Sequence, residues 1–164
     1  MAHTDTRARI KRVGWEFAPP EGWTYAQEED LTIASGKAAI LGVTSFDAGD
    51  AKVARTARED ALRLVADKLG LTLPKKKTYF AKKADQKQKV GDLDVELFQL
   101  DGAKRDGKKG PLLIFAAQAP NERVLVGAGF VADDDADNSD EAIMKAIESI
   151  APAADSTEVS KNSP

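Results

Sequence analysis

Three apolar runs lie close together in the second half of the chain, at residues 93–100, 111–118 and 124–131. In the first run, apolar residues alternate with Asp94 and Glu96, which is the period of a strand with one buried face. The second run is apolar at almost every position, as in a central strand covered by a helix. We therefore predict a three-stranded antiparallel meander that the other elements pack against.

The first run changes phase after Leu97, because Phe98 and Leu100 fall on the opposite face. A β-bulge, or burial of both faces near the strand end, explains this change. The link that follows, residues 101–110, is polar and too long for a tight hairpin, so we expect a solvent-exposed loop. Residues 119–122 (Ala-Pro-Asn-Glu) have the composition of a compact turn between the second and third runs.

Short extended segments precede the meander. Apolar residues alternate over residues 13–17, and the prolines and glycine that follow predict a turn. Further strands are expected at residues 23–25, 31–35 and 37–46. A hairpin around Gly36 would join the last two of these strands.

A long amphipathic helix is predicted to end near Leu69. Asp50 or Asp47 can accept hydrogen bonds from its first amides, and Gly70 is the residue type expected just past its end. Apolar side chains recur every three or four residues and form the buried stripe: Ala54, Ala57, Ala61, Leu62, Leu64, Val65 and Leu69. The charged side chains between them are expected to face water: Glu59, Asp60, Arg63 and Asp67.

A second helix is predicted near the end of the chain. Asn138 with Glu141 three residues later resembles a capping pair, with Asn138 in the cap position. The helix would run to about Ala151. Its buried stripe is formed by four apolar residues: Ile143, Ala146, Ile147 and Ile150.

These elements predict an α+β fold, in which an antiparallel sheet of the meander and N-terminal strands is flanked by the long helix and the C-terminal helix. A chain of 164 residues suits one domain, which we place at residues 13–151. Residues 1–12 lack periodicity and are expected to form a flexible arm. Residues 152–164 are small, polar and bounded by prolines, and are expected to form a disordered tail.

The composition, 31% charged and 42% hydrophobic, is that of a soluble globular protein. The absence of cysteine excludes disulfides, cysteine nucleophiles and thiolate metal sites. No apolar run approaches the roughly 20 residues of a membrane span. No apolar stretch follows the first basic residues, so the sequence as written indicates a cytoplasmic protein. A periplasmic location stays open if an export signal was removed.

Charge is distributed unevenly along the chain. Residues 75–109 carry 11 basic and six acidic side chains, whereas residues 110–164 carry three basic and ten acidic ones. A chain with a net charge of −3 is a poor general binder of nucleic acid, so we predict no nucleic-acid partner. The basic segment can still steer another protein with an acidic surface.

Most catalytic side chains are missing from this sequence. The single histidine is His3, in the expected flexible arm, which argues against histidine catalysis and histidine metal sites. Residues 127–129 (Gly-Ala-Gly) lack the third glycine of a dinucleotide-binding turn and lie within a predicted strand, so close packing is favoured over a phosphate cradle. Asp94 and Glu96 share a strand face, which is expected to be a water-facing edge rather than an acid–base pair.

Asp133, Asp135 and Asp137 have the spacing that opens a calcium-binding loop. The twelfth position of that loop, where a bidentate carboxylate is required, holds Met144. A solvated acidic loop before the helix is therefore favoured over a calcium site. We predict no catalytic residue, no metal and no cofactor.

The residues 20–23 (Pro-Glu-Gly-Trp), following the aromatic strand at 15–17, resemble the opening of the PsbP/Mog1-like superfamily, which includes bacterial lipoprotein and DcrB-like members. The resemblance spans residues 13–151. It is carried by the order of the elements and by three residues: Pro20, Gly22 and Trp23. It implies an antiparallel sheet flanked by helices. It also implies mainly non-catalytic roles, as accessory subunits, chaperone-like factors and binders of other proteins.

Four basic side chains crowd the predicted loop between the first two strands of the meander: Lys104, Arg105, Lys108 and Lys109. Three interpretations stay open for them. They form a solvated mobile loop, they recognise an acidic protein surface, or they bind nucleic acid or anionic lipid. Trp15 and Trp23 are either core residues or exposed aromatic anchors for a partner.

The favoured hypothesis is a non-enzymatic accessory or protein-interaction module that binds another protein through the basic loop, with Trp15 and Trp23 as further candidate contacts. The alternative is a small-molecule or lipid carrier with a cavity between sheet and helix, lined by residues such as Phe115 and Phe130. A third hypothesis is an enzyme that uses carboxylates alone. Neither the partner nor the oligomeric state follows from the sequence.

Overall fold

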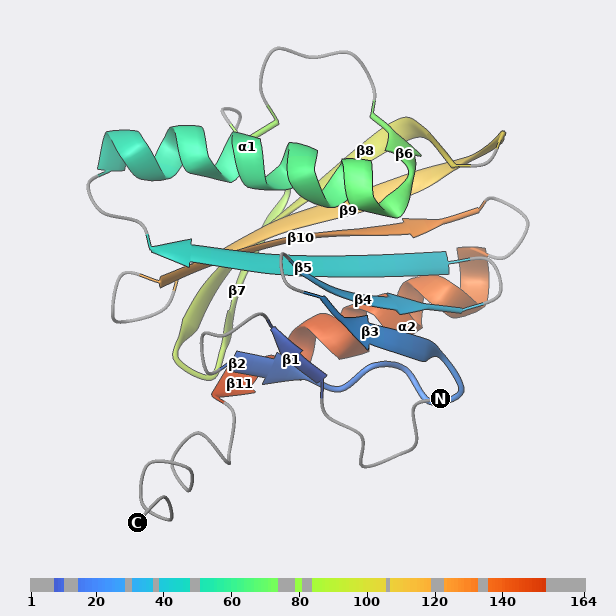
Figure 1. Cartoon of the computed structure of the whole chain (residues 1–164), viewed down its shortest axis with the longest axis horizontal. Helices are drawn as coiled ribbons and strands as arrows, with labels where there is room; N and C mark the ends of the chain where they lie inside the picture. Colours follow the sequence, from blue (N-terminus) through green and yellow to red (C-terminus); the bar gives the residue numbers. More distant parts are fainter. Residues whose placement is uncertain are drawn as a thin grey trace.

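The fold is an open antiparallel sheet with helical cover on both faces (Figure 1). The computed structural model describes residues 8–10, 15–28, 31–36, 39–47, 51–73, 79–80, 84–105, 107–118, 123–132 and 136–152. The two helices are α1 (Ala51–Leu69) and α2 (Ala136–Glu148). The large sheet has eight strands: β3 (Thr24–Gln27), β4 (Thr32–Ser35), β5 (Ala39–Asp47), β6 (Leu71–Thr72), β7 (Gln86–Val90), β8 (Leu93–Arg105), β9 (Lys108–Gln118) and β10 (Arg123–Val131).

The strands of the large sheet lie in the order β3-β4-β5-β10-β9-β8-β6, and β7 pairs with β8 beside β6. Every described pairing is antiparallel. A second, three-stranded sheet is formed by β1 (Ala8–Ile10), β2 (Trp15–Phe17) and β11 (Ala151–Pro152). The predicted α+β class, with an antiparallel sheet flanked by a long helix and a C-terminal helix, is confirmed.

The predicted meander is present as β8, β9 and β10. The expectation of a long loop over residues 101–110 is wrong, because β8 continues to Arg105 and β9 begins at Lys108. Gly107 has φ +81°, a left-handed conformation that suits a tight turn. The polar composition misled the prediction, since Ala103 and Gly110 are the buried positions among the described residues 102–110 and are too few to define an apolar alternation.

Two separate cores explain the change of phase along β8. Leu93, Val95 and Leu97 belong to the core beneath α2, whereas Phe98 and Leu100 belong to the core beneath α1. Burial of both faces is therefore the correct explanation. A register shift is also present, but it lies farther along the strand, between Leu100 and Ala103.

Helix α1 lies across β5 and β10 (Figure 1) and ends at Leu69, as predicted. Its fully buried side chains include Leu62 and Val65, which pack against the apolar side chains of the sheet. A Cβ atom at Gly42 on β5 would lie 3.1 Å from both Val65 and Leu69, so the absence of a side chain there lets the helix sit close to the sheet.

One charged residue of α1 does not face water as expected. Glu59 is only 8% exposed, and its carboxylate accepts hydrogen bonds from the backbone amides of Tyr79 and Phe80. The Tyr79 amide lies 2.9 Å from Oε1 and 3.0 Å from Oε2, and the Phe80 amide lies 2.8 Å from Oε2. Glu59 thus holds the connection between β6 and β7 against α1. The prediction that Glu59 faces water was wrong because the apolar stripe of a helix does not show which distant segments pack against its charged side chains.

Helix α2 and the small sheet cover the other face. The helix begins at Ala136, so Asn138 lies within its first turn and is not the cap that we expected. A Cβ atom at Gly129 of β10 would lie 2.8 Å from Ile143 of α2, which shows how closely this helix approaches the sheet. Ile143 and Ile147 are buried in the core that they share with Phe115.

The small sheet brings together segments from the two ends of the chain. Residues 8–10, expected within a flexible arm of residues 1–12, form β1, in which Ala8 and Ile10 are fully buried. This strand was missed because two small apolar positions between charged ones are too few to define a period. Strand β2 pairs with β1 on one side and with β11 on the other. Beside it, the Ala18 amide donates to Ser149 Oγ at 2.7 Å, across 131 residues of sequence.

Candidate functional site

The four predicted basic residues lie at the tip of the β8–β9 hairpin. Lys104 is directly opposite Lys109, and Arg105 is directly opposite Lys108. The three lysines are exposed and Arg105 is half-buried. Because residues that face each other in an antiparallel pair share one side of the sheet, the cations divide two and two between its faces. We call these four residues the basic tip.

The base of the basic tip is held by α1 and by the strand that follows it. Arg105 Nε donates to the carbonyl oxygen of Leu69, the last residue of α1, at 2.8 Å. A cation that binds the last carbonyls of a helix also interacts favourably with the helix dipole. Leu71 and Thr72 pair with Arg105 and Lys104, so β6 extends the sheet to this point. The basic tip is therefore a strand pair that β6 extends on one side, and the sequence had indicated a loop at this position.

The arrangement of the basic tip places like charges opposite each other. Cross-strand neighbours have Cβ atoms about 5 Å apart, and like charges directly opposite each other destabilise a strand pair. Two such pairs follow each other, Lys104 with Lys109 and Arg105 with Lys108. Anionic groups that approach the tip would reduce this repulsion.

The two tryptophans lie away from the basic tip and differ in exposure. Trp15 on β2 is 8% exposed and belongs to the core beneath α2. Trp23 is half-buried and packs on Gly36, where a Cβ atom would come within 2.6 Å of the indole ring. Of the two interpretations, the structure places Trp15 in the core and Trp23 against the core edge. Among the described residues, the large apolar side chain that is exposed is that of Tyr25 on β3, which is 38% exposed.

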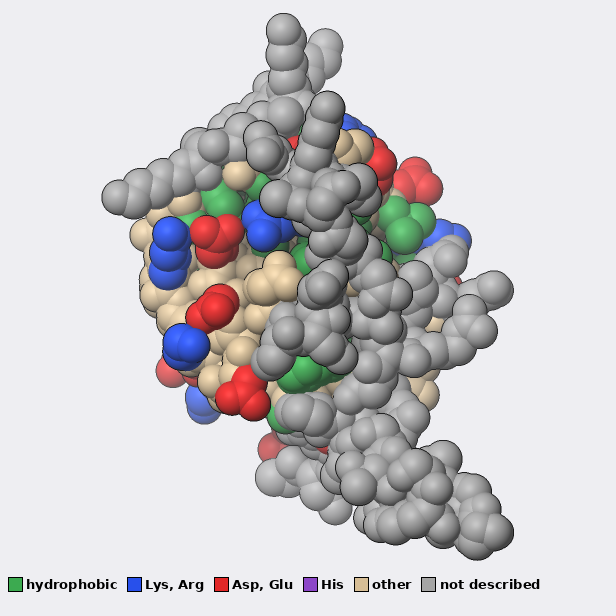
Figure 2. Space-filling model, turned by 90° about the vertical axis from the view of Figure 1, so that its left-hand side faces the viewer, with side chains coloured by type: hydrophobic (Ala, Val, Ile, Leu, Met, Phe, Trp, Pro, Cys, Tyr) green, Lys and Arg blue, Asp and Glu red, His purple; other side chains and the backbone are tan. Residues whose placement is uncertain are grey.

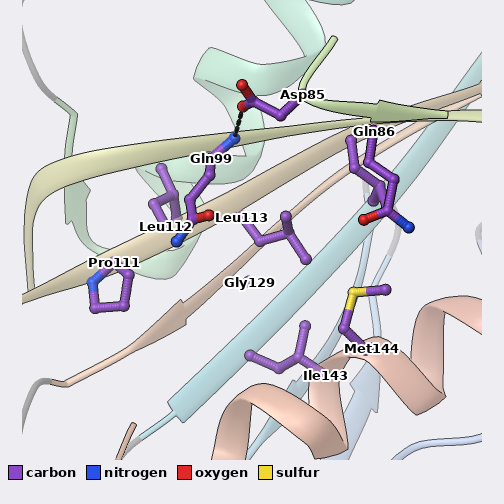
Figure 3. Close-up of a pocket in the computed structure, with 10 residues that line it drawn as sticks. Asp85, Gln86, Gln99, Pro111, Leu112, Leu113, Gly129, Ile143 and Met144 are labelled. Atoms are coloured by element: carbon purple, nitrogen blue, oxygen red, sulfur yellow. Dashed lines mark hydrogen bonds between the residues drawn. The ribbon is translucent and has the colours of Figure 1, made fainter.

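A cavity of about 260 Å³ opens on the α2 side of the large sheet (Figure 3). Its walls come from β8, β9, β10 and α2, and from the start of β7: Asp85, Gln86, Leu97, Gln99, Pro111, Leu112, Leu113, Gly129, Ile143 and Met144. Figure 3 shows Ile143 and Met144 rising from α2 toward Leu113 on the sheet. Pro111, Leu113 and Met144 are each half-exposed, so part of the apolar wall is open to solvent.

The cavity follows from a row of neighbouring residues across three strands. Gly129 is paired with Leu113, and Leu113 is paired with Gln99. Gly129 supplies no side chain and lets Ile143 of α2 approach the strand, whereas Leu113 is half-buried and Gln99 is polar and exposed, and this row lines the hollow next to α2. The glycine in the third apolar run was the signal for the close approach of a helix. The sequence did not reveal which residues of the helix would face it.

One edge of the cavity is polar. Asp85 Oδ2 accepts a hydrogen bond from the Gln99 amide at 2.7 Å, and the Asp85 amide donates to the Leu97 carbonyl at 2.9 Å. Asp85 thus continues the pairing of β7 with β8 by one step and satisfies a backbone donor at the edge of the sheet. Gln86 lies next to it on the cavity wall.

Phe115 and Phe130, which we expected to line a carrier cavity, do not line this one. Phe115 is fully buried in the core beneath α2, and Phe130 is 2% exposed in the core beneath α1. The Phe115 ring fills the space above Gly127, where a Cβ atom would lie in contact with it. Residues 127–129 therefore lie in the interior of β10 and form a close-packed strand, not a phosphate cradle.

A second, wider groove of about 530 Å³ lies on the α1 side, near the turn between β7 and β8. Its charged side chains form ion pairs. Lys89 lies 3.2 Å from Asp94, whereas Glu96 is shared between Lys87 at 3.8 Å and Arg58 at 3.5 Å. Figure 2, which faces the end where α1 begins, shows basic and acidic side chains interspersed on the described surface. The two carboxylates are thus engaged with cations and not with each other.

The predicted acidic loop lies largely outside the described residues, which include neither Asp133 nor Asp135. Asp137 belongs to the first turn of α2. Within the described ranges, no three acidic or histidine side chains are grouped as ligands for a metal ion.

No protein-family model and no curated protein matches this chain. Among solved structures, a protein from Bacteroides thetaiotaomicron VPI-5482 is similar over 93% of this chain, with 10% identity and a TM-score of 0.55. The match covers 49% of that protein, so this chain spans about half its length. A point mutant of the protein Mog1 is similar over 93% of this chain and 98% of its own, with 12% identity and a TM-score of 0.45.

The likeness to the Bacteroides protein concerns the fold alone. Neither helix in the described part of the chain combines the length and apolar composition required to cross a membrane.

Proposed function

We propose that this chain is a non-enzymatic protein-interaction module that binds an acidic surface of another protein through the basic tip. The observation that carries the proposal is the pairing of cations with cations on a supported hairpin. Lys104 directly opposite Lys109 is an unfavourable like-charge pair, and it becomes favourable when a carboxylate of a partner lies between the two ammonium groups. Because Arg105 is fixed to the end of α1, little order has to be gained on binding.

The non-enzymatic part of the proposal rests on the residue types present. The single histidine, His3, lies outside the described residues, and there is no cysteine. Asp94 and Glu96, the carboxylates considered for acid–base chemistry, are held in ion pairs with lysine and arginine. A binding role requires none of these groups.

The test is an affinity capture from lysate of the source cell, read by quantitative mass spectrometry at low and high salt. The variant Lys104→Glu/Lys109→Glu reverses the two charges on one face of the tip. The control, Lys87→Glu/Lys89→Glu, makes the same change of charge at two exposed positions of β7. It also replaces the ion pairs with Glu96 and Asp94 by like-charge pairs, so thermal unfolding first establishes that this variant is folded. We expect a stoichiometric partner that is released by salt and lost only from the tip variant. Equal capture by the two variants would refute the role of the basic tip.

A second candidate function is that of a small-molecule or lipid carrier, and the cavity beside α2 favours it. At about 260 Å³, the cavity lies below the roughly 300–1,000 Å³ typical of small-molecule sites. Native mass spectrometry of freshly isolated protein tests this candidate. A retained non-covalent ligand supports a carrier, and an apo mass counts against it.

A further inference from the structure

We propose that the cavity beside α2 is the anchor pocket for one apolar side chain of the acidic partner, and that the partner segment runs along the sheet from Asp85 toward the basic tip. This inference rests on the proposed function. It adds the cavity as a second contact site and gives the direction in which the partner segment lies along the sheet. The occupant is an extended protein segment with one aliphatic or aromatic residue and, beyond it, one or more carboxylates.

The cavity and half of the basic tip lie on the same face of the sheet. The register shift between Leu100 and Ala103 places its extra residue on β8, because these two residues pair with Leu112 and Gly110 of β9. Strand β9 therefore keeps its alternation, and Lys109, Pro111 and Leu113 alternate with residues that face α1. Lys104, directly opposite Lys109, shares this face. Residues two apart in a strand are separated by about 7 Å, so Lys109 lies roughly 13 Å along β9 from Leu113. An extended segment covers that distance in about four residues.

The size and walls of the cavity suit a single side chain. A volume of about 260 Å³ is small for a whole cofactor but sufficient for one large apolar group. Pro111, Leu113 and Met144 are half-buried on its wall, and Ile143 is buried. Flexible methionine side chains adapt to different occupants and are common at such binding surfaces. Apolar anchors in pockets of this kind carry much of the affinity of protein interfaces.

The charges of the cavity wall and of the basic tip differ in sign, which gives the bound segment a direction. Asp85 lies on the cavity wall, level with Phe98 and Gln99 of β8, and Gln86, which pairs with Leu97, adds a polar group one step farther from the tip. Lys104 and Lys109 lie beyond the end of the cavity that Pro111 lines. A carboxylate of the partner is repelled near Asp85 and attracted near the lysines. The acidic residues should therefore follow the anchor on the side of the basic tip.

The experiment is a selection from a random peptide library displayed on phage, with the folded full-length chain as bait. Enriched peptides are synthesised and their affinities measured by fluorescence polarisation at low and high salt. Two variants address the cavity: Leu113→Gln makes its wall polar, and Gln99→Trp fills it from an exposed position. Lys104→Glu/Lys109→Glu addresses the tip, and Lys87→Glu/Lys89→Glu is the charge-matched control. Thermal unfolding establishes that each variant is folded before its affinity is measured.

We expect enriched peptides to share one apolar residue and acidic residues about four positions away. Both cavity variants should weaken binding by about ten- to a hundred-fold, the value of burying one large apolar side chain. The tip variant should weaken binding at least as much and remove its salt dependence, whereas the control leaves affinity unchanged. Agreement between two different cavity variants excludes a defect that is specific to one of them.

Other outcomes separate this inference from the function on which it rests. Acidic peptides that bind the cavity variants normally, but not the tip variant, overturn the anchor pocket and leave the basic tip in place. Apolar peptides that are insensitive to the tip variant overturn both. A small molecule retained in the cavity in native mass spectrometry, or no enrichment of peptides at all, also overturns the anchor pocket. Self-association that buries the cavity, detected by analytical ultracentrifugation, does the same.

Discussion

The buried carboxylate of Glu59 provides a quantitative test of how the connection between β6 and β7 is held. Replacing Glu59 with alanine removes the acceptor of two backbone amides, those of Tyr79 and Phe80. Each buried donor that loses its partner costs about 1–3 kcal/mol, so the two together predict a loss of about 2–6 kcal/mol. This loss has an upper limit, because the segment that holds Tyr79 and Phe80 can instead detach and give both amides to water. Exposing the two side chains in that way costs about 1.5–3 kcal/mol each.

Glu59→Gln distinguishes the hydrogen bonds from the packing of the side chain. A glutamine keeps the shape and one carbonyl acceptor, but its amide nitrogen cannot accept a hydrogen bond. One amide therefore keeps a partner, although a neutral one, and we expect roughly half the loss seen for Glu59→Ala. The neighbouring residue Asp60 is exposed, so Asp60→Asn and Asp60→Ala make the same changes of charge with effects within about 0.5 kcal/mol.

The assay is equilibrium unfolding in urea, followed by circular dichroism and tryptophan fluorescence, with the free energy of unfolding taken from linear extrapolation. Natural domains are stable by about 5–15 kcal/mol, so the alanine variant should stay folded but with a clearly lower midpoint. If Glu59→Ala and Asp60→Ala unfold at the same denaturant concentration, the amides of Tyr79 and Phe80 do not depend on the carboxylate and the reasoning is refuted.

Two further predictions concern packing and surface charge. Gly129→Ala should lower the free energy of unfolding by about 1–3 kcal/mol, because its Cβ atom would lie 2.8 Å from Ile143, and thermal unfolding measures the change; an unchanged midpoint would show that α2 can move away freely. Lys89→Ala removes an ion pair whose lysine side chain is 73% exposed, so the same measurement should change by less than about 1 kcal/mol, and a larger loss would mean that this pair is not screened by solvent.

The strands were predictable where each had a buried face. The alternation of Leu93, Val95 and Leu97 gave the first strand of the meander, and the apolar character of residues 111–118 gave its central strand. Both patterns arise from burial, which leaves a direct trace in the sequence. Where strands leave the core, as β8 and β9 do toward the basic tip, that trace ends although backbone pairing continues.

Contacts between distant segments were not predictable in the same way. Glu59 looked like any exposed residue of an amphipathic helix, since its partners lie 20 and 21 residues away and are backbone groups of no particular residue type. The cavity depends on Gly129 lying beside Leu113 and beneath α2, which is a matter of register between strands. A single sequence indicates each element but does not give the register that brings Asp85 and Met144 to one site.

The small sheet also constrains the order in which parts of this chain can fold. Strand β2 lies between the earliest described strand, β1, and the last, β11, and the Ala18–Ser149 hydrogen bond spans 131 residues beside it. Contacts over such sequence distances form late, because a long loop must close first. During synthesis, β1 and β2 can pair with each other early, but one edge of β2 has no strand to accept until residues 151 and 152 leave the ribosome. We therefore expect the small sheet to be the last part of the molecule to become native.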